Sequence, residues 1–199
     1  VHGSVRLSNH REGSSLMPIA SDLVVENGAG LSAANTYINL APAATYHALR
    51  GNEIWADASE SDQVVALIRA TDYVESRWTF TGTPLLTTQA LSFPMAAKYL
   101  NNRGADVSST VPAEIAEATA EYALAVLGTG AGLVDLSPAV DQTEPHSVNY
   151  KREKVGTLEE ETRFDTARGI KITLSYPTAD KIIQSSGFLA GGRSGSTIR

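Results

Sequence analysis

The sequence predicts a mainly α-helical protein: a small helical bundle with an inserted β-hairpin and extended N- and C-terminal arms. Several segments repeat their apolar residues at helical spacing between recognisable helix ends, and one later segment alternates like a pair of strands. The 199 residues, 42% of them hydrophobic, suffice for one core with appendages. We therefore expect an N-terminal arm (1–21), a helical domain (22–187) with a hairpin at about 148–164, and a C-terminal tail (188–199).

The helix that begins after Ser59 has the clearest signals. Ser59 can cap its first turn, and the acidic Glu60 and Asp62 suit its positive end. Apolar side chains and one threonine then recur at helical spacing: Val64, Leu67, Ile68, Thr71, Val74 and Trp78. A turn at 81–84 ends this segment, and the aromatics of the crossover that follows are expected to lie beneath the helices.

Three further helices are expected, each closed by a glycine suited to a left-handed helix end. They are Ala41–Arg50 before Gly51, Pro112–Leu127 before Gly128, and Ala179–Ser185 before Gly187. The alanine-rich 112–127 segment permits close helix contact, so it is expected to be central to the bundle.

Other local features complete the expected fold. Tyr46 and Leu49 of the first helix should enter the core, as should Ile182 and Ile183 of the last helix, which Thr178 can cap. A short β-type run at Asp22–Val25 precedes a turn. Val148–Val155 and Leu158–Phe164 flank Gly156 and Thr157 and alternate like a hairpin, which is marginal alone and is expected to lie on the bundle or pair with a neighbouring chain.

Composition excludes several classes of function. The chain has no cysteine, so disulfides, thiolate catalysis and Cys-ligated zinc are excluded, and a reducing cytosol is the expected place of synthesis. No apolar run approaches the roughly 20 residues that span a bilayer, and no membrane partner is expected. The net charge of −6 makes the average surface repel nucleic acid, so any DNA contact must be local.

No catalytic, cofactor or metal site is expected. The four histidines (His2, His10, His47 and His146) lack the spacing of metal ligands. The glycines at 128–132 follow a helix, unlike those of a phosphate-binding loop, and read as a helix end and linker. Asp72 and Glu75 lie one turn apart beside Arg69 and Arg77, which favours ion pairing within the helix. The protein is therefore expected not to be an enzyme.

One compact basic cluster leaves two interpretations open. It comprises Tyr150, Lys151, Arg152 and Lys154. The cations and the tyrosine could contact single-stranded DNA by charge and stacking. However, Glu159, Glu160 and Glu161 follow closely, and this favours complementary surfaces on adjoining subunits.

Several motifs carry a resemblance to a known family. They are DLVVENGAGL (22–31), ALIRATDY (66–73) followed by Trp78 and QALSFP (89–94), VPAEIAEATAEYALAVL (111–127), YKREKVG (150–156) and YPTADKIIQSSGFL (176–189). In their order and spacing, over most of 22–193, they resemble the tailed-phage family catalogued as DnaT-like single-stranded-DNA-binding proteins. The expected helical bundle and hairpin also resemble head-completion, or head–tail connector, proteins.

The resemblance implies two functions. As a connector, the protein would be a structural protein of the virion neck, made in the cytoplasm of the host bacterium and assembled head to tail into a ring of about twelve copies. DNA would pass through that ring between the portal protein and a tail or second neck protein. The expected portal-docking residues are Phe188, Leu189, Arg193, Ile198 and Arg199. The alternative is a replication accessory protein that binds single-stranded DNA through the basic cluster.

Overall fold

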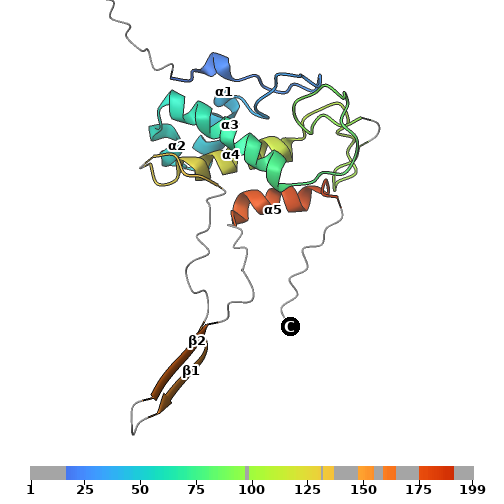
Figure 1. Ribbon diagram of the computed structural model, residues 1–199. Coiled ribbons are helices and arrows are strands. Elements are labelled where there is room, and N and C mark those ends of the chain that lie inside the picture. The colour runs from blue at the N-terminus through green and yellow to red at the C-terminus, as the bar shows by residue number, and fades with distance from the viewer. Residues whose placement is uncertain are drawn as a thin grey trace, which may run out of the picture.

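The computed structural model describes residues 17–96, 99–130, 132–136, 148–154, 159–164 and 175–190. Within these residues the predicted fold class is confirmed, because helices dominate and the extended elements are a hairpin and isolated bridges (Figure 1). The elements are a 3₁₀ turn η1 (Ala20–Asp22), helices α1 (Leu40–Ala48), α2 (Glu53–Asp57), α3 (Glu60–Arg77) and α4 (Ala113–Leu127), strands β1 (Val148–Lys154) and β2 (Glu159–Phe164), and helix α5 (Pro177–Ser186).

Helix α3 forms where its sequence signals predict. The Ser59 hydroxyl oxygen accepts a hydrogen bond from the Asp62 backbone N–H at 3.1 Å, which satisfies one donor that the helix leaves unpaired. Glu60 and Asp62 lie in the first turn, where the helix dipole favours negative charge. Val64, Leu67 and Val74 are fully buried, so the apolar stripe faces the core.

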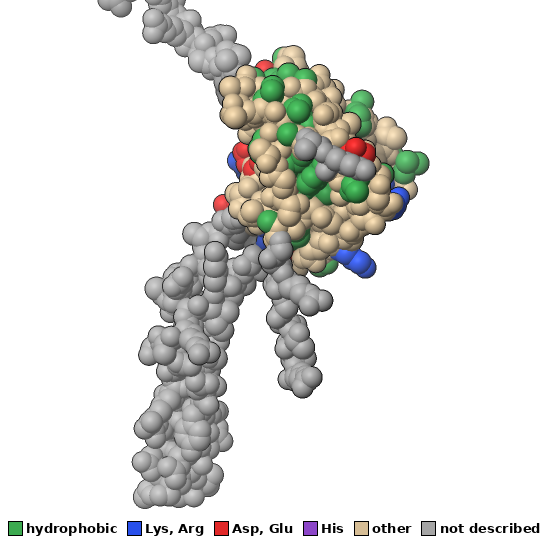
Figure 2. All heavy atoms as spheres, turned by 90° about the vertical axis from the view of Figure 1, so that its right-hand side faces the viewer, with side chains coloured by type: hydrophobic (Ala, Val, Ile, Leu, Met, Phe, Trp, Pro, Cys, Tyr) green, Lys and Arg blue, Asp and Glu red, His purple; other side chains and the backbone are tan. Residues whose placement is uncertain are grey.

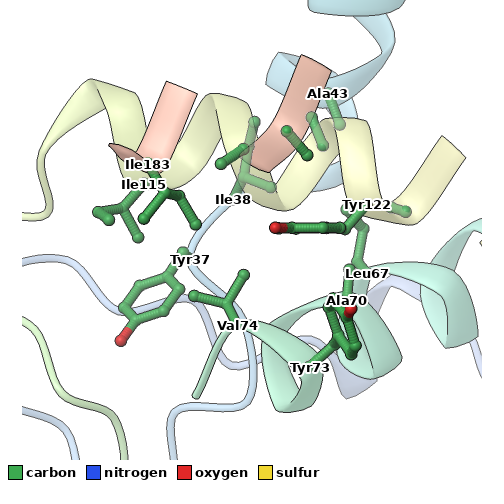
Figure 3. Packing of buried hydrophobic residues seen from close by; sticks show 14 of the residues in the cluster. Tyr37, Ile38, Ala43, Leu67, Ala70, Tyr73, Val74, Ile115, Tyr122 and Ile183 are labelled. Carbon is green, nitrogen blue, oxygen red and sulfur yellow. The ribbon is translucent and has the colours of Figure 1, made fainter. Parts of the chain in front are cut away.

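Helix α4 lies at the centre of the bundle, as its small residues predict. It packs against α3 on one side and α5 on the other, and also contacts α1 and α2. Its alanines at 118, 120 and 123 are fully buried and permit the close approach, while Ile115 and Tyr122 fill the space toward Leu67, Val74 and Ile183 (Figure 3). Gly128 ends the helix at φ +61°, a backbone conformation that favours glycine.

A polar cluster fastens α5 to the other two helices. The Asp180 carboxylate accepts hydrogen bonds from Arg77 of α3 at 2.8 Å, from the Tyr122 hydroxyl of α4 at 2.5 Å and from the Tyr176 backbone N–H at 3.2 Å. Trp78 Nε1 donates to the Tyr122 hydroxyl at 3.1 Å. Because the Asp180 side chain is only 8% exposed, these donors compensate for the water that it loses.

The crossover at 78–111 contributes its aromatic side chains to the core, as predicted, but they pack mainly on one another and on neighbouring loops. Phe93 is fully buried, and its ring contacts Tyr37, Phe80, Tyr99 and Phe188 with centroids 5.0 to 6.3 Å apart. The Phe93–Pro94 peptide bond is cis. Figure 1 shows these loops gathered at one end of the helical bundle, so they form a cap on the core.

The C-terminal segment returns to this cap. Phe188 is fully buried and stacks on Tyr99 at 5.3 Å, and Leu189 forms an antiparallel bridge with Phe80. The Thr81 N–H donates to the Phe188 carbonyl at 2.7 Å, and the Ala190 N–H donates to the Thr79 carbonyl at 2.9 Å. The domain therefore extends to Ala190, past the predicted boundary at 187.

Two local predictions were wrong, one was confirmed only in part, and one helix was missed. Leu49 is 81% exposed, because α1 ends at Ala48 and the chain turns toward Gly51, whereas Tyr46 is buried as expected. Helix α2 was not predicted, since its five residues are too short for a periodic pattern. The predicted β-type run at 22–25 is confirmed only in part, because Asp22 ends the 3₁₀ turn η1 whereas Leu23 is extended and Val25 forms an isolated parallel bridge with Thr36. Thr178 does not cap α5, because Tyr176 occupies the N-cap position and Asp180 accepts from its N–H.

We predict that Phe188→Ala lowers the free energy of unfolding by about 3–5 kcal/mol, because it removes a fully buried ring that packs against the rings of Phe93 and Tyr99. Urea unfolding followed by circular dichroism measures the change. Leu49→Ala, at an exposed position, is the matched control and should change the same quantity by less than about 0.5 kcal/mol. A Phe188→Ala protein as stable as the Leu49→Ala protein would contradict the burial of the C-terminal segment.

Candidate nucleic-acid interface

The hairpin register divides the basic cluster between two faces. Tyr150 pairs with Arg163, Arg152 with Glu161, and Lys154 with Glu159. Alternate residues of a strand lie on opposite faces, so these six positions share one face, which we call the Tyr150 face. The other face holds the register pairs Lys151 with Thr162 and Glu153 with Glu160. The register therefore brings Tyr150, Arg152 and Lys154 together and separates Lys151 from them.

The two faces differ in charge. The Tyr150 face has three cations and two anions, whereas the other face has one cation and two anions. Arg163 was not among the predicted contact residues, because its place on this face depends on the pairing register of the two strands. Glu159 and Glu161 are register partners of Lys154 and Arg152 within the same hairpin. The turn at 155–158 lies outside the described residues.

The helical part of the protein is strongly acidic. In the described residues outside the hairpin, fourteen Asp and Glu stand against five Lys and Arg, a net charge of −9. On the face that Figure 2 shows, the Lys and Arg side chains lie near the rim and form no patch. Because nucleic-acid binding depends on clustered cations, the helical part is unsuited to hold a phosphate backbone.

Two surface hollows of the helical part have the same acidic character. The larger, of about 470 Å³, lies between α3, α4 and the 134–136 segment and includes Arg69, Asp72 and Asp135 in its lining. Burial raises the pKa of the Asp72 carboxyl. The smaller, of about 210 Å³, has Asp57 and Asp62 at the start of α3. Carboxylates in both hollows disfavour an anionic ligand.

A family model described as "Putative DnaT-like ssDNA binding protein" matches residues 21–199. The chain belongs to this family. Searches of curated proteins and of solved structures found no match. The family assignment confirms the DnaT-like part of the predicted resemblance, and its description agrees with the single-stranded-DNA alternative.

The residues predicted to dock this DnaT-like protein onto a portal fall into two groups. Phe188 is fully buried and is better explained as a core residue, whereas Leu189 is half-buried beside Phe80. Arg193, Ile198 and Arg199 lie outside the described residues. Docking onto a portal through the segment beyond Ala190 stays a prediction.

Glu75 has a different role from the predicted ion pair within α3. Its carboxylate accepts hydrogen bonds from the Tyr37 hydroxyl and from the Ser92 N–H and hydroxyl, which ties the N-terminal loop to the crossover. Burial, followed by the charge of Glu75, raises the pKa of the Tyr37 hydroxyl. Arg77 likewise reaches Asp180 of α5. The carboxylates of Glu75 and Asp180 thus stabilise the fold by joining segments that are distant in the sequence.

His47 of this family member is a buried core residue. Its ring stacks on Trp55 at 4.5 Å, and Asn52 contacts its Nδ1 at 3.0 Å. Nε2 has no hydrogen-bond partner of normal geometry among the described residues. Burial lowers the pKa of the imidazole from 6.5 to about 4, because the charged form would lose its hydration.

Neither a cluster of metal ligands nor a membrane-spanning helix is found in the part of the chain that the structure describes. No three His, Asp or Glu residues there come together as metal ligands would. None of the helices there combines the length and apolar character needed to cross a bilayer. The hairpin thus remains the candidate interface.

We predict that His47 makes the domain acid-sensitive. The folded state keeps the imidazole neutral down to about pH 4, whereas the unfolded chain binds a proton below about pH 6.5. Stability is therefore lost as the pH falls through this window, and the free energy of unfolding should be about 2 kcal/mol lower at pH 5 than at pH 7 from this group. Urea unfolding at both pH values measures it.

The His47→Gln variant is the control, because the amide keeps a polar group beside Asn52 but does not titrate in this range. The carboxylates are the same in both proteins, so their contribution to the change in unfolding free energy cancels when the two proteins are compared. An equal loss of stability between pH 7 and pH 5 in the two proteins would show that His47 is not the sensitive group.

Proposed function

We propose that this protein binds single-stranded DNA through the Tyr150 face of its hairpin. The observation that supports the proposal is the register, which groups Tyr150 with Arg152, Lys154 and Arg163 on one face. The family description points to the same ligand. Neither an enzymatic step nor a cofactor is part of the proposal.

The binding chemistry combines stacking with charge. A tyrosine ring can stack on any base, and cations on the same face can contact the phosphates on either side of that base. This recognition needs no particular sequence. Glu159 and Glu161 on the same face, together with the acidic helical part, oppose the DNA charge, so contact is confined to a few nucleotides and weakens with salt.

We predict that the protein binds a fluorescent single-stranded oligonucleotide in low salt, with the logarithm of the binding constant falling by about 2 per tenfold increase in salt, as three phosphate contacts require. Replacing Arg152, Lys154 and Arg163 by serine should abolish the binding and, with it, the salt dependence. Tyr150→Ala should cost about 1–3 kcal/mol of binding free energy. Fluorescence anisotropy titration measures all three effects.

The matched control replaces three exposed cations of the helical part, Arg69, Arg103 and Lys181, by serine. It changes the net charge by the same amount and should leave most of the affinity. If both triple variants lose affinity equally, the effect is one of overall charge and the Tyr150 face is not the binding site.

The second candidate function is a subunit of the ring between a phage portal and its tail, located in the virion neck. The acidic helical part favours it, because a channel surface that repels phosphate lets DNA pass without holding it. The partners would be further copies of the chain, about twelve in the ring, with the portal protein and a tail or second neck protein. In this role the segment beyond Ala190 would dock onto the portal.

We predict for this function that the protein joins purified portal rings, and that truncation after Ala190 prevents the joining while leaving the domain folded. Mass photometry with and without portal rings measures it. Assembly with portal and no oligonucleotide binding would favour the ring subunit. Salt-sensitive oligonucleotide binding without portal association would favour the DNA-binding protein.

A further inference from the structure

The hairpin has two open edges. In the part of the chain that the structure describes, β1 and β2 pair with each other and with no third strand. Each strand therefore has a row of backbone N–H and C=O groups on its outer side with no strand beside it. A two-stranded hairpin alone is marginally stable in water, so a further strand on either edge would stabilise it.

The two edges carry opposite charge. β1 holds Lys151, Arg152 and Lys154 with Glu153, a net charge of +2. β2 holds Glu159, Glu160 and Glu161 with Arg163, a net charge of −2. Opposite charges on adjacent strands stabilise a sheet, and like charges destabilise it.

We infer that the hairpins of successive copies pair head to tail, with β1 of one copy beside β2 of the next. Copies related by rotation about an axis parallel to the strands keep the same strand directions, so the strands alternate and the product is one continuous antiparallel sheet. The twofold alternatives would place β1 beside β1 or β2 beside β2, with like charges opposed. Charge thus selects the heterologous contact, which closes into a ring if the rotation closes.

This inference concerns the edges of the hairpin, whereas the proposed DNA contact uses one of its faces. The two are independent, because a strand added at an edge leaves both faces open. The sheet would also repeat the Tyr150 face from copy to copy along its length. Several such faces in a row would offer several stacking sites to one DNA strand.

Cysteine scanning of the full-length protein tests the pairing. The chain has no cysteine, so a single introduced thiol reports only on its own position. One β1 variant, Glu153→Cys, is mixed in turn with four β2 variants: Glu159→Cys, Glu160→Cys, Glu161→Cys and Thr162→Cys. After mild oxidation in low salt, covalent dimers are quantified on a non-reducing gel, and the four β2 positions sample the registers that the two copies can adopt.

The expected result is that at least one mixture gives several-fold more dimer than either of its variants alone, and that high salt suppresses the excess. If every mixture gives no more dimer than its single variants, the head-to-tail pairing is wrong. Dimers confined to Glu153→Cys alone, or to a β2 variant alone, would overturn it in favour of a twofold contact. Oligonucleotide binding by a protein that forms no such dimers would overturn this inference and leave the proposed function intact.

Discussion

The contact between Arg77 and Asp180 decides how the helices are arranged. Two charges that are mostly removed from water need partners, and the Tyr122 hydroxyl and Tyr176 N–H supply the further donors to the carboxylate. Because the partners come from α3, α4 and the start of α5, only one relative position of these helices gives the Asp180 carboxylate all its hydrogen bonds. Sliding α5 along α4 would leave a buried charge without partners, at a cost of several kcal/mol. The register of α5 fixes in turn where Phe188 meets the aromatic cap.

The predictable part of the fold rests on local chemistry. Ser59 and Gly128 mark the start of α3 and the end of α4 through contacts with their own neighbours, and such contacts are visible in sequence. Errors arose where distant residues intervene. Thr178 is a reasonable cap by residue type, but Asp180 takes the N-terminus of α5 because Arg77 and Tyr122 already hold its carboxylate. Phe188 resembled a tail residue because the Thr81 to which it bonds lies 107 positions away in the chain.

The candidate interface was predictable in composition but not in arrangement. Tyr150, Arg152 and Lys154 could be chosen from their residue types. That these three share a face follows from the alternation of a single strand. Whether Arg163 lies on the same face depends on the pairing register of the two strands, and a shift of one residue would move it to the other face. The helical part is acidic and therefore repels a polyanion. The cations on the Tyr150 face of the hairpin are for this reason the better place for DNA to bind.

The return of the chain from α5 to the aromatic cap has a consequence for biosynthesis. Phe93 and Tyr99 can complete their packing only after Phe188 has arrived, and the backbone bonds to Thr79 and Thr81 also wait for residues 188–190. A nascent chain that has left the ribosome only as far as α4 therefore still exposes these aromatic rings. The cap can therefore close only after residues 188–190 have been synthesised, and until then the apolar surface of Phe93 and Tyr99 that Phe188 covers stays uncovered.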